Sequence, residues 1–325
     1  MADVARLAGV SKMTVSRALS GRGVSAQTRT RIMAAVEAVH YVHDAAAGAL
    51  SSGRSGFVAA LVPTLANSNF ADTVRGLSDG LAEAGLQVLL GYTDYRLERE
   101  ETLVRTMLRH RPEAMVLTGG EHLPATRALL RRAGVLVAET WDLPADPLGL
   151  VAGFSNAAAA AQMVRHLADR GYRRIAFIGG ELGQDLRGMD RRRGYAEALA
   201  ALGLGPPRIV DHGAPPIGSA QGAAAMGLMM RQWPDTDAVF CVSDLSAMGA
   251  VMECHRNGWV IPGRVAVAGF GDFEGAESCF PTLTTVQVDP LAIGRQTASL
   301  LLGALGGGPL GTAQLPVRIV QREST

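Results

Sequence analysis

The chain opens with a stretch that predicts two short helices joined by a tight turn, residues 2–21, ADVARLAGVSKMTVSRALSG. Gly9 stands where the chain must turn after the first helix, because glycine adopts a positive φ without strain. Ser11 can cap the second helix by accepting a hydrogen bond from an N–H at its start. Apolar residues at helical spacing give each helix a buried face, and they are Val4, Ala5, Ala8, Val15, Ala18 and Leu19.

The opposite, outer face of the second helix is free of these buried residues. It carries Lys12, Met13, Thr14, Ser16 and Arg17. A short helix that offers donors and cations from its N-terminal end suits a reader of the DNA major groove. The alternative is a small helical cap on an enzyme. The agreement of turn, cap and exposed face favours the helix-turn-helix interpretation.

Charge is divided unevenly along the chain. Residues 1–54 hold seven basic and three acidic residues, whereas the remainder holds 24 basic and 27 acidic residues. The overall net charge of +1 therefore hides a basic head on a mildly acidic body. This division indicates a polyanionic partner for the head alone.

A third helix is expected from about Thr28 to Val39, with Ser25 as its cap. Its inner stripe is Ile32, Val36 and Val39. Residues 44–52 have marginal helix propensity and are too short to form a stable helix alone. The expected domains are a helix-turn-helix head at 1–43, a hinge and linker at 44–56, and a body at 57–325.

From residue 57 onward, apolar strands alternate with amphipathic helices. The expected strands are Phe57–Val62, Leu86–Tyr92, Ala114–Thr118, Val135–Glu139, Arg174–Gly179, Arg208–Asp211, Ala238–Val242, Val265–Phe270 and Thr284–Val288. The expected helices are Asn69–Ala84, Glu98–Arg109, Ala125–Arg132, Ala157–Arg170, Arg191–Leu202, Ser219–Arg231, Ser246–Asn257 and Leu291–Leu305. This alternation predicts an α/β fold of two similar lobes with parallel sheets covered on both faces. The last strand and helix would recross between the lobes.

Motifs for catalysis and metal binding are weak. The glycine-rich run at Gly179–Gly183 lacks the Lys-Ser/Thr of a P-loop and the dinucleotide spacing. Cys241, Cys254 and Cys279 are far apart and have no ligand-type spacing. We therefore expect no catalytic residue, metal or cofactor. The chain has no signal-type apolar start and no membrane-length apolar run, so we expect a cytoplasmic protein without a membrane partner.

Several segments resemble one protein family over nearly the whole chain. Residues 3–17 fit the pattern D-V-A-x-x-A-G-V-S-x-x-T-V-S-R, and the body contains RGYRRIA at 170–176, SDLSAMGA at 243–250 and VAGF at 267–270. By these motifs the chain resembles the LacI/GalR family of bacterial transcription regulators. The resemblance implies a DNA-binding head, a hinge and a two-lobed, periplasmic-binding-protein-like sensor.

Within that family the chain most resembles gluconate-operon repressors. The shared segments are Ser11–Arg17, Leu61–Leu65, Asn69–Ala71 and Gly153–Asn156. The resemblance implies a repressor whose effector is a small sugar acid such as gluconate or a ketogluconate. The alternatives are a regulator of the same family that responds to a neutral sugar or a corepressor, and a sugar-binding transport-type protein.

The chain departs from the family pattern in two places. The family usually has several more residues before Asp3, including a Thr that touches a phosphate. In the hinge the family has Asn-Arg near the position of Asp44 and Ala45, so backbone contacts there should be weaker. Gly48 further lowers helix propensity.

Resemblance and position together assign roles on the DNA. Lys12, Met13 and Arg17 would contact base edges. The residues placed for phosphates are Thr14, Ser16, Ser25, Thr28 and Arg29. Leu50 would wedge into the minor groove, or alternatively rest on the body as a linker residue. Paired hinges require a homodimer, which implies a palindromic double-stranded operator, and the absence of a leucine heptad tail predicts dimers rather than tetramers.

The first candidates for effector binding follow the strands, because the carboxyl ends of parallel strands point into the cleft. They are Asn69, Phe70, Trp141, Asp142, Arg191, Ser243, Asp244 and Asp272. Arg191 is assigned to a carboxylate, with Arg187, Arg192 and Arg193 as competitors. Phe70 is equally suited to the core, Asp244 to capping the next helix, and Asp272 to bonding backbone N–H groups.

Overall fold

The computed structural model describes residues 1–19, 23–41, 55–180, 183 and 185–325. The chain divides into two compact units, Met1–Gly56 with His110–Pro112 and Phe57–Arg109 with Glu113–Thr325. Most of the expected hinge and linker falls outside the described residues, so the domain boundaries stay predictions.

The described part of the first unit contains three helices: α1 (Ala2–Ala8), α2 (Lys12–Leu19) and α3 (Ala26–Ala38). Gly9 ends α1 with a left-handed φ of 63°. The Ser11 hydroxyl accepts a hydrogen bond of 3.1 Å from the Thr14 N–H, as the sequence predicts. Ser25 caps α3 in the same way and accepts from the Thr28 N–H at 3.3 Å, so α3 begins two residues earlier than expected.

The core of this head is small. It consists of Val4, Ala5, Ala8, Val15, Ala18, Ile32 and Ala35. Val39 was expected on the inner stripe of the third helix, but it is the C-cap of α3 and 38% exposed. Leu19 is only half-buried.

The first lobe of the second unit is built on a parallel sheet in the order β11-β5-β4-β3-β1-β2. Its strands are β1 (Phe57–Val62), β2 (Gln87–Tyr92), β3 (Ala114–Thr118), β4 (Leu136–Thr140), β5 (Leu150–Gly153) and β11 (Thr312–Gln314). One face packs on α5 (Ser68–Ala82) and α12 (Pro290–Leu305), and the other on α6 (Leu97–Leu108) and α7 (Pro124–Ala133).

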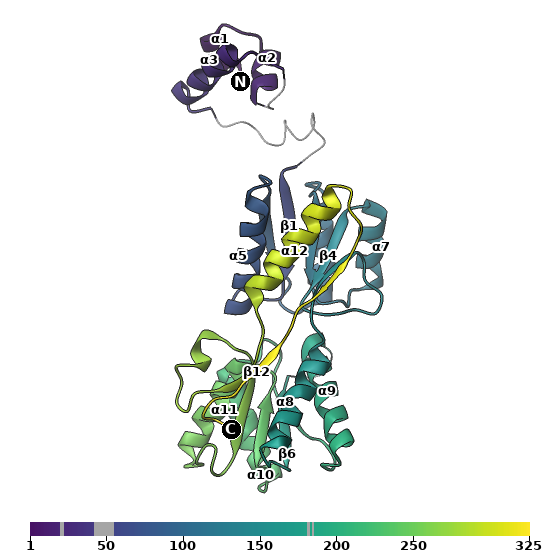
Figure 1. Cartoon of the computed structure of the whole chain (residues 1–325), viewed down its shortest axis with the longest axis vertical. Coiled ribbons are helices and arrows are strands. Elements are labelled where there is room, and N and C mark those ends of the chain that lie inside the picture. Colours follow the sequence, from purple (N-terminus) through teal and green to yellow (C-terminus); the bar gives the residue numbers. More distant parts are fainter. Residues whose placement is uncertain (20–22, 42–54, 181–182, 184) are drawn as a thin grey trace. The chain divides into compact units, whose positions relative to one another are not determined.

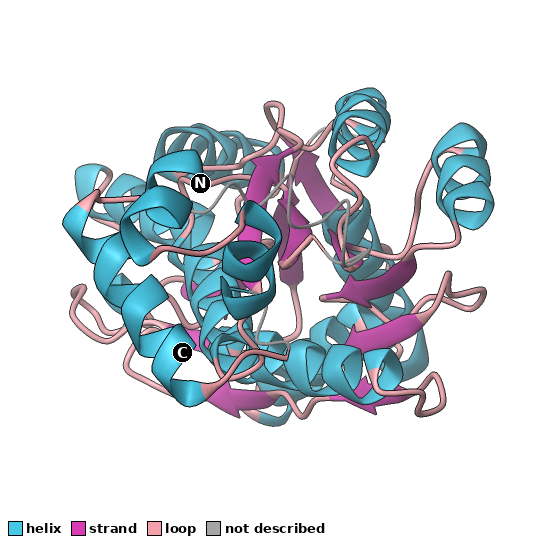
Figure 2. Cartoon of the chain, turned by 90° about the horizontal axis from the view of Figure 1, so that it is seen from above, coloured by secondary structure: helices cyan, strands magenta, loops and turns pink. Residues whose placement is uncertain are grey.

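The second lobe has a sheet in the order β12-β10-β9-β8-β6-β7, parallel except for β12 against β10. Its strands are β6 (Ile175–Gly179), β7 (Arg208–Asp211), β8 (Ala238–Cys241), β9 (Ala266–Gly271), β10 (Thr284–Gln287) and β12 (Arg318–Val320). Its helices are α8 (Asn156–Asp169), α9 (Leu186–Leu202), α10 (Ser219–Gln232), α11 (Asp244–Arg256) and the 3₁₀ turn Glu274–Ala276. Helices flank the strands on both sides (Figure 2), so the predicted α/β fold with two parallel-sheet lobes is confirmed.

The chain passes between the lobes three times: from β5 to α8, from β10 to α12, and from β11 to β12. The late helix α12 lies alongside α5 (Figure 1). A Cβ at Gly76 would collide with the main chain of Leu291, so glycine permits this close approach. Among the described residues, no helix combines the length and apolar character needed to cross a membrane.

Candidate functional sites

A cavity of about 220 Å³ lies between the two lobes of the second unit, and residues of both lobes line it. The carboxyl ends of the strands of both sheets point toward it, as expected for this fold class. The sequence-predicted effector residues in its wall are Asn69, Phe70, Trp141, Arg191 and Ser243. Three further candidates, Asp142, Asp244 and Asp272, do not line it.

Arg191 is buried against the cavity. Its Nε–H donates to Asn156 Oδ1 at 3.0 Å, and its Nη1 donates to the Val242 carbonyl at 2.8 Å. The guanidinium carbon lies 3.7 Å from the centroid of the Phe270 ring. Burial lowers the pKa of the guanidinium to about 10, against the opposing charge of Asp185, so the group stays cationic at neutral pH. Within the described residues, Nη2 has no protein hydrogen-bond partner.

Arg187 shares the cavity with Arg191. The prediction that a helix begins at Arg191 was wrong, because α9 begins at Leu186. The two arginines are therefore one turn apart on the same helix face. Nη1 of Arg187 donates to the Thr118 carbonyl of the first lobe at 3.4 Å, and its guanidinium carbon lies 5.5 Å from the Phe70 ring centroid.

Tyr95 and Asp185 also line the cavity, and neither was among the sequence candidates. Tyr95 follows β2 in a left-handed conformation, with φ of 56°. Burial, reinforced by Asp185, raises the pKa of the Tyr95 hydroxyl to about 12. The position of Tyr95 just after a strand was a usable signal. Among the described lining residues, the charged ones are Arg187, Arg191 and Asp185, which leaves one net positive charge.

Aromatic rings form the apolar wall. The Trp141 ring meets Phe70 edge-on at a centroid distance of 5.2 Å. The indole N–H donates to Thr73 Oγ1 at 3.1 Å, so Trp141 offers a ligand its ring rather than its donor. Trp141 has a φ of 69°, and the Asn156 amide holds its carbonyl at 2.9 Å. A bulky residue keeps such a conformation only where its surroundings fix it.

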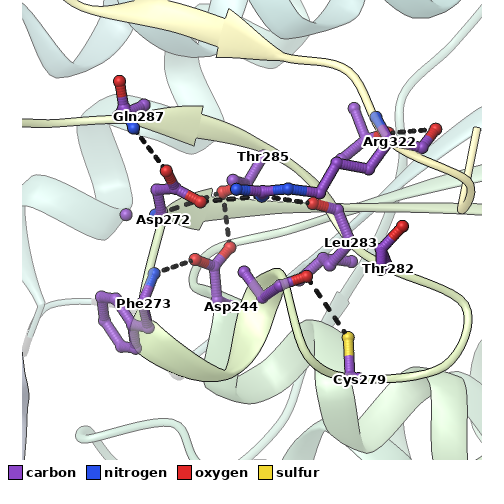
Figure 3. Close-up of polar contacts among 12 residues, drawn as sticks. Asp244, Asp272, Phe273, Cys279, Thr282, Leu283, Thr285, Gln287 and Arg322 are labelled. Carbon is purple, nitrogen blue, oxygen red and sulfur yellow. Dashed lines mark hydrogen bonds and ion pairs between the residues drawn. The ribbon is translucent and has the colours of Figure 1, made fainter.

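Asp244 and Asp272 bind groups within the protein (Figure 3). The Asp244 carboxylate accepts from the Thr285 hydroxyl at 2.6 Å and from the Phe273 N–H at 2.7 Å. Asp272 forms an ion pair of 2.7 Å with Arg322 and accepts from the Gln287 amide at 2.5 Å. These contacts fix the loop that follows β9. A direct effector contact by either carboxylate stays a prediction.

The two remaining candidates occupy the edges of the site. Ser243 caps α11 by accepting from the Ser246 N–H at 3.3 Å, and it also faces the cavity. Asp142 accepts from the Leu143 N–H at 2.9 Å and lines two neighbouring hollows. Burial raises the pKa of the Asp142 carboxyl.

The candidate DNA contacts lie in the head. Lys12, Met13, Arg17, Ser25 and Arg29 are exposed, and Met13 is 66% exposed. Thr14, Ser16 and Thr28 are half-buried. Thr14 and Thr28 stand at helix N-termini, where N–H groups favour an anion. Leu50 lies outside the described residues, and the contacts of this set with DNA stay predictions.

One pattern associated with hydrolases occurs in the chain, G-x-S-x-G at Gly76–Gly80. It lies inside helix α5 rather than on the strand-to-helix turn that exposes a nucleophile. Ser78 therefore stands on a helix surface without the strained elbow that this chemistry requires.

Residues 1–44 match the family model described as bacterial regulatory proteins, lacI family, and residues 164–325 match a periplasmic binding protein-like domain. The chain is 34% identical to the HTH-type transcriptional regulator GntR of Pseudomonas aeruginosa, over 99% of this chain and 94% of that protein. A LacI family transcriptional regulator from Silicibacter pomeroyi is 45% identical with a TM-score of 0.79, over 83% of this chain and 98% of that chain. A second structure from that organism, also a transcriptional regulator, has 33% identity and a TM-score of 0.90, over 99% and 98%.

Proposed function

Because the chain belongs to the LacI family of bacterial regulatory proteins, we propose that it is a sequence-specific DNA-binding repressor controlled by a small sugar acid such as gluconate or a ketogluconate. The head at 1–43 reads the operator, the hinge at 44–56 transmits the signal, and the body at 57–325 holds the acid and forms the dimer. The protein acts in the cytoplasm as a homodimer on a palindromic operator, since a two-fold assembly presents two identical readers.

The observation that most supports an acidic effector is the position of Arg191. It brings a buried cation to a cavity of net positive charge, and its Nη2 has no protein partner within the described residues. A carboxylate can accept charge-assisted hydrogen bonds from such a guanidinium and neutralise its charge. A neutral sugar would leave the charge and the N–H groups without that partner.

Two further features support a small polyhydroxylated acid. The cavity volume of about 220 Å³ lies below the range of about 300–1,000 Å³ that holds drug-sized ligands. The rings of Phe70 and Trp141 suit the C–H faces of a sugar chain, while Asn69 and Ser243 offer polar groups for hydroxyls. The resemblance to gluconate-operon repressors narrows the acid to gluconate or a ketogluconate.

Control follows from a difference in affinity between two conformations. An acid bound between the lobes favours one lobe orientation, and that orientation separates or disorders the paired hinges. The two heads then no longer bind both half-sites of the operator at once, and the DNA is released.

The test begins with selection of an operator from random duplex DNA, followed by fluorescence anisotropy with the full chain. Gluconate and 2-ketogluconate should release the selected duplex, and glucose should not. Equal release by glucose would contradict an acid effector. A transport-type protein or an enzyme would select no duplex at all.

A further inference from the structure

A second hollow of about 220 Å³ adjoins the cavity. Tyr95, Asp185 and Arg187 belong to the walls of both spaces. The second hollow is acidic: its charged residues are Arg96, Glu100, Glu121, Asp142, Asp185, Arg187 and Asp190. The interlobe cleft thus consists of a positive space and a negative space with a shared wall.

Arg187 is the part of that wall that reaches from one lobe to the other. Its side chain leaves α9 and donates to the Thr118 carbonyl at the end of β3. The guanidinium carbon lies 6.0 Å from the Tyr95 ring centroid and 5.5 Å from that of Phe70. A Cβ at Gly119, where φ is 97°, would lie only 3.5 Å from Nη1 of Arg187, so the guanidinium rests directly on the main chain of the first lobe.

We propose that Arg187 sets the length of ligand that the cleft accepts. With Arg187 in place, the positive cavity takes an acid of a single sugar unit. Removal of this side chain joins the two spaces and admits an aldobionic acid, a sugar acid that carries a second sugar ring. The inference that the effector is an acid depends on the proposed function. The inference that its length is limited depends on the position of Arg187.

The charges of the two spaces also fix the direction of the longer ligand. Its carboxylate lies at Arg191, because the acidic groups of the second hollow repel an anion. Its second ring lies among Asp142, Glu121 and Asp190, whose carboxylates accept hydrogen bonds from sugar hydroxyls. Asp142 then contacts the second ring rather than the acid.

Calorimetry on the full chain tests the length limit with four ligands: gluconate, cellobionate, glucose and cellobiose. Wild type should prefer gluconate to cellobionate, and Arg187→Ala should shift that ratio toward cellobionate by about tenfold or more, the scale on which pocket shape discriminates ligands. Arg187→Lys keeps a long cation and should keep the wild-type ratio. Arg256→Ala is the matched control, because Arg256 lies in the same lobe and both it and its ion-pair partner Glu253 lie outside both walls.

The length limit is overturned if Arg187→Ala gains no relative affinity for either two-ring ligand, or if wild type already binds cellobionate as tightly as gluconate. If instead the hypothesis of an acidic effector is wrong, wild type binds glucose as tightly as gluconate. The glucose and cellobiose pair then still measures the length effect. Circular dichroism checks folding, and Arg187→Gln carries the same test if Arg187→Ala does not fold.

Discussion

The side-chain amide of Asn69 donates a hydrogen bond of 3.1 Å to the carbonyl oxygen of Gly271 and joins the two lobes at the wall of the cavity. Asn69 stands in the first turn of α5, and Gly271 ends β9. The bond exists only while the lobes keep this relative orientation. A ligand beside it therefore meets a wall whose geometry depends on lobe closure.

Asn69→Asp should weaken effector binding, because a carboxylate cannot donate to the Gly271 carbonyl and repels it. We expect the unfolding free energy to fall by about 1–3 kcal/mol, the cost of a buried polar group left without its partner. Calorimetry and urea unfolding measure the two effects. Ser68→Ala, at an exposed neighbouring position, is the control. Unchanged effector affinity in Asn69→Asp would show that the bond does not contribute to the closed site.

Arg191→Ala should lower the affinity for gluconate far more than the affinity for glucose, because only the acid loses a charge-assisted hydrogen bond. A loss of about 10- to 100-fold for the acid is expected from about 1.5–3 kcal/mol for such a bond. The variant also loses its bonds to Asn156 and Val242, so stability falls as well. Comparing both ligands on the same variant by calorimetry cancels that loss. Equal weakening of the two ligands would refute the carboxylate role.

Asp244 should make stability depend on pH. Burial raises the pKa of its carboxyl to about 6, from 3.8 in the unfolded chain, although hydrogen bonds from Thr285 and Phe273 oppose the shift. The folded protein therefore holds this proton more tightly than the unfolded chain. The stabilising contribution is complete below about pH 3.8 and is lost as the pH rises through about 6.

Urea unfolding of wild type and Asp244→Asn at a series of pH values isolates this group, because the other titrations cancel in the difference. From pH 7 to pH 4, wild type should gain stability relative to Asp244→Asn, by no more than about 3 kcal/mol. A difference that stays constant over this range would show that the carboxyl titrates alike in both states.

Arg17→Ala and Arg29→Ala should separate base reading from phosphate anchoring. Loss of Arg17 should reduce discrimination at one symmetric pair of base positions, by about 1–3 kcal/mol, and leave non-specific binding nearly intact. Loss of Arg29 should weaken all duplexes similarly and flatten the salt dependence of binding. Anisotropy at several salt concentrations, on operator and mutated operators, measures both. Identical effects of the two variants would contradict the division of roles.

Leu50→Ala should reduce operator affinity and DNA bending together without changing the preferred outer bases, because a minor-groove wedge acts through deformation. Circular-permutation gel shifts or energy transfer between labelled DNA ends measure the bend. If DNA bending and operator affinity both stay at wild-type values, the hypothesis that Leu50 inserts into the minor groove is wrong. The Asp44 and Gly48 departures would then mark a hinge that works differently from the family pattern.

The strands that the sequence predicts well are those buried on both faces. β1 and β3 match the expected bounds, because a parallel strand covered by helices is a continuous apolar run between turns. β7 also matches its expected bounds, although it is a half-buried strand at the edge of its sheet. β5, β11 and β12 span only three or four residues, too short to show a period, and they form because neighbouring strands pair with them. Such strands form because of tertiary contacts, which the periodicity of the sequence does not reveal.

The site shows the same limit. Asn69 and Trp141 follow strands and line the cavity as expected, but the start of α9 was placed too late because Gly188 lowers helix propensity there. A Cβ at Gly188 would crowd Asp185 and Val242, so close packing requires that glycine inside the helix. Asp272 also follows a strand, yet its partner Arg322 comes from the far end of the chain. No local pattern reveals that pairing.

The three passages of the chain between the lobes have a consequence for synthesis. While the ribosome adds residues up to 289, the first sheet lacks β11 and helix α5 lacks its covering helix α12. The apolar core of the head, by contrast, draws only on residues near the start of the chain. A premature stop codon before Pro290 therefore leaves the apolar core of the head complete but the first lobe without α12 and β11.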